Sequence, residues 1–74
     1  MRPMQYLVIV EESERGFGAY VPDLPGCVAA AETRREVVAL IQEAIEFHID
    51  GLRKAGDPVP APRSRGELVD VRAA

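Results

Sequence analysis

The sequence is poor in the residues that usually stabilise or functionalise a very small protein. Cys27 is the only cysteine and cannot form an intramolecular disulfide. Tryptophan is absent. His48 is the only histidine, and together with the one cysteine it supplies too few ligands for a zinc site. No hydrophobic run approaches the ~18 residues of a membrane span, and no secretory leader pattern follows Met1. We therefore expect a cytoplasmic protein without metal, cofactor or membrane anchor.

The chain length is a second limit on the fold. Its 74 residues predict one domain spanning 1–74, and a domain of this size buries only ~60% of its unfolded surface. Because no disulfide supplements so small a core, we expect self-association as a homodimer or homotetramer.

The charge pattern narrows the class of partner. Nine basic and twelve acidic residues give a net charge of −3, and the basic ones are scattered without interleaved aromatics. This pattern argues against DNA or RNA binding by this chain alone and favours a basic protein partner.

Short apolar or alternating segments predict three N-terminal strands, over residues 4–12, 17–21 and 27–32. Thr33 and Glu36 have capping-box spacing, and apolar residues then recur at helical intervals until Gly56 supplies a stop.

The C-terminal part predicts a last strand. Residues 57–65 form a proline-rich crossing, and 66–71 are a short apolar segment. Because a helix between two strands normally makes a right-handed crossover, we expect an α+β fold of the type βββαβ. It would have a four-stranded mixed sheet in the order 3-2-1-4, with one helix on one face.

The first predicted strand is apolar on both sides, since Leu7 and Ile9 alternate with Tyr6, Val8 and Val10. One helix covers only one face, so the other would expose an apolar patch unless a second copy shields it. The residues predicted on this oligomer face are Leu7, Ile9 and Tyr20.

The segment Pro22-Asp23-Leu24-Pro25-Gly26 cannot be regular structure, because two prolines lack amide donors and glycine favours a positive φ. Pro22, Pro25 and Gly26 are explained by backbone shape alone. Asp23 suits either contact with a basic partner or hydrogen bonds to nearby amides. Leu24 suits either a presented hydrophobic anchor or a side chain folded back over the sheet edge.

The run Tyr20-Val-Pro-Asp-Leu-Pro-Gly-Cys27, followed by Thr33-x-x-Glu36 and an apolar helix, resembles the HicB-like antitoxins of bacterial toxin–antitoxin pairs. The resemblance extends from Tyr6 to Val71. It implies a partially reduced ribonuclease-H-like domain that masks the RNA-binding face of HicA, a small RNA-cleaving toxin. Family members often carry a C-terminal DNA-binding module, which we do not expect in a chain ending at Ala74. The residues expected to face the toxin are Asp23, Leu24, Pro22, Pro25 and Gly26.

Two other functions stay open from the sequence. One is a stand-alone oligomeric interaction or small-ligand module without a toxin partner. The other is a metal-dependent nuclease, because ribonuclease-H-like folds work through clustered carboxylates. Solvated charge is the simpler explanation of the acids near strand ends, and core packing is the simpler explanation of Cys27. His48 has no second histidine beside it and acid–base catalysis needs a positioned partner, so we expect no catalytic residue. The acids in question are Glu11, Glu12, Glu32 and Asp70.

Overall fold

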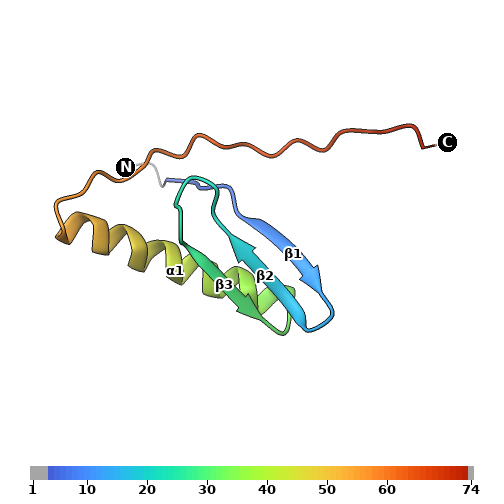
Figure 1. Cartoon of the computed structure of the whole chain (residues 1–74), viewed down its shortest axis with the longest axis horizontal. Helices are drawn as coiled ribbons and strands as arrows, with labels where there is room; N and C mark the ends of the chain where they lie inside the picture. The colour runs from blue at the N-terminus through green and yellow to red at the C-terminus, as the bar shows by residue number, and fades with distance from the viewer. Residues whose placement is uncertain (1–3, 74) are drawn as a thin grey trace.

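A computed structural model describes residues 4–73 of the chain. Three antiparallel strands form one sheet in the order β1-β2-β3, and a single helix packs on one face of it (Figure 1). The last part of the chain, residues 57–73, is extended and contains no helix or strand. The elements in chain order are β1 (Ile9–Ser13), β2 (Gly16–Tyr20), β3 (Val28–Ala31) and α1 (Arg34–Lys54).

The predicted four-stranded sheet in the order 3-2-1-4 is wrong. Residues 66–71 form no strand in the described chain, so the architecture is βββα and β1 is an edge strand instead of an interior one. The physical reason lies just upstream, where residues 60–64 are hydrogen-bonded to other parts of the chain. These bonds direct the following residues past the sheet instead of along β1 (Figure 1).

The hairpin between β1 and β2 depends on one glycine. Ser13 pairs with Gly16 at the end of the ladder, and Gly16 has a φ of +139°. A Cβ atom at this position would lie 2.4 Å from the carbonyl oxygen of Ala31 on the neighbouring strand. Because β2 and β3 approach so closely here, only glycine fits without a backbone shift.

Helix α1 begins and ends at the predicted signals. The backbone N–H of Glu36 donates to Oγ1 of Thr33 at 3.1 Å, and the Thr33 hydroxyl donates to the Glu36 carboxylate at 2.8 Å. At the other end, Gly56 has a φ of +76° and its N–H donates to the Arg53 carbonyl, while that of Asp57 donates to the Leu52 carbonyl. This pair of bonds is a Schellman motif, which satisfies carbonyls at the end of the helix.

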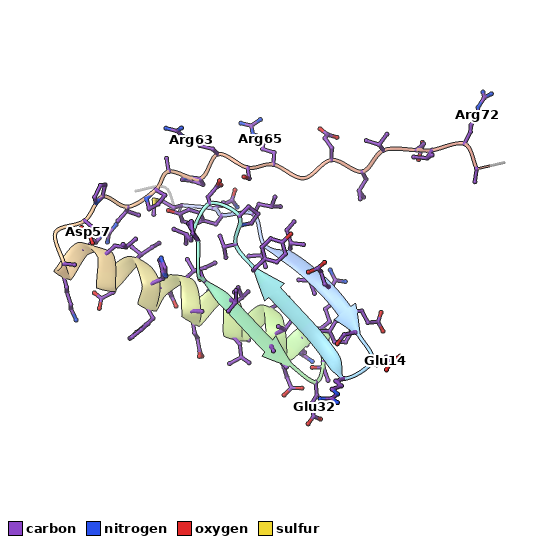
Figure 2. All side chains as sticks on the ribbon, in the orientation of Figure 1. Glu14, Glu32, Asp57, Arg63, Arg65 and Arg72 are labelled. Carbon is purple, nitrogen blue, oxygen red and sulfur yellow. The ribbon has the colours of Figure 1, made fainter. Side chains whose placement is uncertain are left out.

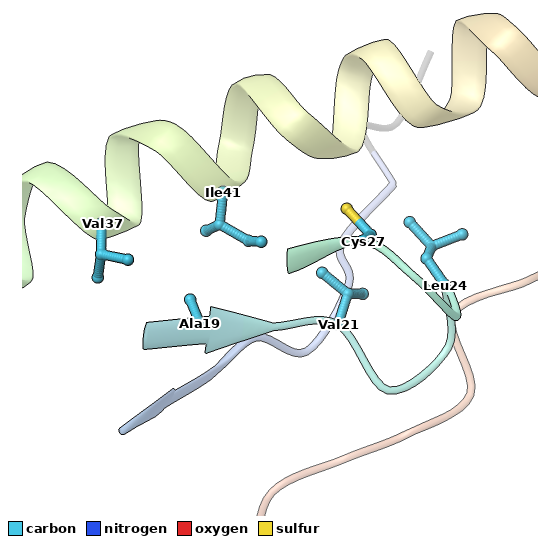
Figure 3. Packing of buried hydrophobic residues seen from close by; sticks show 6 residues of the cluster. All are labelled: Ala19, Val21, Leu24, Cys27, Val37 and Ile41. Carbon is cyan, nitrogen blue, oxygen red and sulfur yellow. The ribbon is translucent and has the colours of Figure 1, made fainter. Parts of the chain in front are cut away.

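The core lies between α1 and the sheet, and half of it comes from the segment that links β2 to β3. Val37 and Ile41 project from α1 towards β2, as Figure 3 shows. Cys27 is buried as a free thiol, and this burial raises the pKa of the thiol. The buried residues of this core are Ala19, Val21, Leu24, Cys27, Val37 and Ile41.

Candidate partner-binding site

The segment from Val21 to Cys27 is a rigid loop made of two consecutive turns. The N–H of Leu24 donates to the Val21 carbonyl at 3.1 Å, and the N–H of Cys27 donates to the Leu24 carbonyl at 3.0 Å. A third bond, from the N–H of Val21 to the Cys27 carbonyl at 3.2 Å, closes the loop at its base. We call residues 21–27 the proline loop.

The proline loop buries every third residue, and of the residues between them all but the half-buried Asp23 are exposed. Val21, Leu24 and Cys27 are in the core, and Leu24 has no exposed surface at all. Its side chain therefore anchors the loop from below and offers no area to a partner. The second turn has Pro25 followed by Gly26 at a φ of +86°, the sequence and geometry typical of a type II turn. The exposed residues of the loop are Pro22, Pro25 and Gly26.

Asp23 accepts its hydrogen bonds from a distant part of the chain instead of from the amides of its own turn. Its Oδ2 accepts hydrogen bonds from the backbone N–H groups of Arg63 and Ser64, both at 2.8 Å. Its Oδ1 accepts a third from the Ser64 hydroxyl at 2.8 Å. The bonds from Ser64, followed by that from Arg63, hold the pKa of the Asp23 carboxyl below its ordinary value of 3.8. Asp23 thus ties the C-terminal segment to the proline loop.

A second attachment of the C-terminal segment lies close by. The hydroxyl of Tyr6 donates to the carbonyl of Pro60. Partial burial raises the pKa of the Tyr6 phenol, and the negative charge of Asp23 raises it further. Sequence reasoning missed both attachments, because the short polar run around Ser64 has no local pattern that identifies its partner.

The predicted oligomer face is partly occupied by the protein's own chain. Leu7 lies under the C-terminal segment, since a Cβ atom on Gly66 would be 3.4 Å from Leu7 Cδ1. Ile9 pairs with Tyr20, which is 40% exposed, and Tyr20 pairs with Val28, which is 65% exposed. A short apolar row across the three strands is therefore left at the surface, and association through it remains a prediction.

An open groove beside β1 is not predictable from any pattern in the sequence. Helix α1 packs mainly against β3 and β2 and less against β1, so the inner side of β1 and of the residues before it is incompletely covered. The resulting groove has a volume of about 640 Å³. We call it the edge groove. Its apolar lining consists of Met4, Tyr6, Val8, Val10, Val38, Ile41 and Ile45, and its polar lining consists of Gln5, Arg34, Gln42 and Glu46.

The acids considered for metal chemistry do not come together. Glu11 and Glu12 are on β1, and Asp70 is in the extended C-terminal segment. Glu32 follows β3, as Figure 2 shows. Within residues 4–73, no three His, Cys, Asp or Glu side chains are placed to hold a metal ion. The helix described in this range is not long and apolar enough to cross a membrane.

The sheet, the single helix and the braced proline loop define a small α+β domain with a rigid protruding turn. The chain belongs to the HicB-like antitoxin family of bacterial toxin–antitoxin systems, whose family model matches residues 6–72. The resemblance noted in the sequence is therefore confirmed.

Individual relatives agree with this assignment. A UPF0150 protein of Thermoplasma acidophilum is 37% identical over 71 residues, which are 95% of this chain and 100% of the relative. An antitoxin HicB 2 of Photorhabdus laumondii is 32% identical over 95% of this chain, which spans about half (51%) of that protein. A solved HicA3 and HicB3 toxin–antitoxin complex contains a chain that superimposes with a TM-score of 0.70 at 32% identity, covering 81% of this chain and 70% of that one.

Proposed function

We propose that this protein is an antitoxin that binds a small basic RNA-cleaving toxin of the HicA type in the cytoplasm and covers its RNA-binding face. The observation that carries the proposal is the similarity to a chain of a HicA–HicB complex, at 32% identity and a TM-score of 0.70. The net charge of −3 supports it, because opposite charge accelerates encounter with a basic partner.

We propose the exposed ridge of the proline loop as the contact surface. Pro22, Pro25 and Gly26 are exposed, while the residues between them are fixed in the core or hydrogen-bonded to the C-terminal segment. A loop held in this way loses little conformational entropy on binding, which favours affinity. In this arrangement Asp23 and Leu24 act through the loop shape that they maintain.

Co-expression with the product of the adjacent gene tests the proposal. We expect a stable complex, rescue of cell growth and loss of the neighbour's RNA cleavage when the two purified proteins are mixed. A neighbour that is not a basic RNA-cleaving protein, or that forms no complex, would contradict the antitoxin role and favour a module without a toxin partner.

A matched pair of variants tests the contact surface. Pro25→Arg places a positive charge on the ridge, whereas Ala39→Arg places the same charge on an exposed position of α1. Both change the net charge equally, so a general electrostatic effect weakens both complexes alike. We expect Pro25→Arg alone to lose at least about tenfold in affinity beyond that shared effect. Equal affinities of the two variants would exclude the ridge.

The proposed activity is binding without catalysis. Purified protein incubated with RNA and magnesium or manganese is expected to leave the RNA intact. Cleavage that disappears on chelation would instead support the metal-dependent nuclease.

A further inference from the structure

The last residues of the described chain form an arm that touches little of its own domain. All of residues 67–73 are exposed, and Leu68, Val69 and Val71 are 102%, 75% and 81% exposed. The arm extends well past the sheet in Figure 1, and the molecule is 51 Å long for widths of 27 and 22 Å. Three large apolar side chains in an extended segment are a costly exposure for a small protein. We call residues 67–73 the C-terminal arm.

The edge of β1 offers the backbone and apolar contacts that the C-terminal arm lacks. β1 is an edge strand, so one row of its backbone N–H and C=O groups has no strand partner among the described residues. The edge groove flanks the same strand, and its apolar lining comes from β1, the residues before it and α1. β3 is the other edge, and α1 packs more closely against β3 than against β1. At β1 an added strand would therefore gain both backbone and apolar contacts.

The arm has the pattern of a strand that would fill this groove. Because side chains alternate along an extended chain, Val69 and Val71 lie on one side, and Leu68 and Asp70 on the other. The first pair is entirely apolar and matches the apolar lining of the edge groove. The second pair would lie over the outer side of the sheet, where Ile9 is at the surface.

The C-terminal arm does not pair with β1 of its own domain, because hydrogen bonds hold the residues before it elsewhere. Asp23 binds Arg63 and Ser64, and Tyr6 binds Pro60. The arm starts beyond these bonds, from a segment lying against residues 5–7, and residues 5 and 6 also line the edge groove. The start of one arm and the groove for another thus lie side by side, as a reciprocal two-fold contact requires.

We propose that the C-terminal arm of one copy lies along the outer edge of β1 of a second copy, with Val69 and Val71 in the edge groove, and that the exchange is reciprocal. The occupant of the groove is then a second copy of this chain. The inference is independent of toxin binding, and its test contains no toxin, so either can fail without the other.

Sedimentation equilibrium of the purified full chain tests the proposal with four variants. Val69→Glu changes the arm and Val38→Glu the groove. Val28→Glu and Leu40→Glu are controls, since these side chains are similarly exposed but lie outside both surfaces. The exposures of residues 69, 38, 28 and 40 are 75%, 45%, 65% and 42%.

We expect wild type and both controls to sediment at twice the 8.1 kDa chain mass. Each of the other two variants is expected to raise the dissociation constant at least about tenfold, because it places a charged carboxylate in a contact otherwise made by apolar side chains. Circular dichroism should show the same helix content in all five proteins, since every substituted side chain is exposed. A monomeric wild type, or a dimer that survives Val69→Glu and Val38→Glu, would overturn the proposal. So would a dimer that dissociates only with Val28→Glu, because it would be formed through the sheet face.

Discussion

Asp23 and Ser64 are 41 positions apart in the chain, yet two hydrogen bonds of 2.8 Å join them. The proline loop and the C-terminal segment are therefore one structural unit. We expect Asp23→Asn to weaken this unit, because an amide presents one acceptor oxygen where the carboxylate presents two. Hydrogen exchange of the Ser64 amide should approach the rate of an amide without a hydrogen-bond partner. Exchange within α1 serves as the control and should be unchanged, and an unchanged Ser64 rate would contradict the role of Asp23.

The same bonds make the attachment dependent on pH. The folded-state pKa of Asp23 lies below the ordinary value of 3.8, so the stabilisation is present above pH 3.8 and is lost as the pH falls through the lowered pKa. We expect the Ser64 amide resonance to be constant at neutral pH and to shift towards its free position in that acidic range. The Asp23→Asn protein should lack this transition. A Ser64 shift that titrates identically in both proteins would assign the effect to another group.

We expect Leu24 to make the largest contribution of the proline loop to the stability of the fold. Leu24 has no exposed surface, whereas Leu68 is fully exposed. Leu24→Ala should therefore lower the free energy of unfolding by about 2–5 kcal/mol, and Leu68→Ala should change it by less than about 0.5 kcal/mol. Urea denaturation at a protein concentration far below the dissociation constant of the dimer measures both, because Leu68 lies in the C-terminal arm. Similar values for the two variants would show that Leu24 is not a core residue.

Gly16 and Gly51 allow a comparison between a glycine that is close to a neighbouring strand and a glycine that faces open space. Gly16→Ala would place a Cβ atom 2.4 Å from a strand carbonyl at a φ of +139°, and Gly51→Ala in α1 would meet nothing within 4 Å. We expect the first to destabilise the fold by about 1–3 kcal/mol and the second to stabilise it by up to about 1 kcal/mol. Thermal melts of the two proteins should shift in opposite directions. A neutral Gly16→Ala would mean that the strands can separate there at no cost.

The N-cap of α1 can be tested with a conservative pair. Thr33→Ala removes the oxygen that accepts the Glu36 N–H and should cost about 1 kcal/mol. Thr33→Ser keeps a hydroxyl at the same position and should retain most of that stability. The difference between the two unfolding free energies isolates the hydrogen bond from the side-chain contacts. Equal losses would assign the effect to the Thr33 methyl group instead.

The sequence by itself determined the local structure of this protein. Capping residues, glycine positions and proline pairs act over a few residues, so the span of α1, the hairpin at Gly16 and the turns after Val21 were predictable. The motif around the proline loop was likewise sufficient for the family resemblance, because it is contiguous in the chain.

Only the tertiary structure decided what the C-terminal segment does. Residues 66–71 have the composition of a strand, but strand formation needs a partner edge, and three hydrogen bonds to Asp23 and one from Tyr6 direct the segment elsewhere. Likewise, the edge groove exists because α1 sits mainly over β3 and β2. Such contacts join residues some 40 to 54 positions apart, and their geometry depends on the packing of the whole domain.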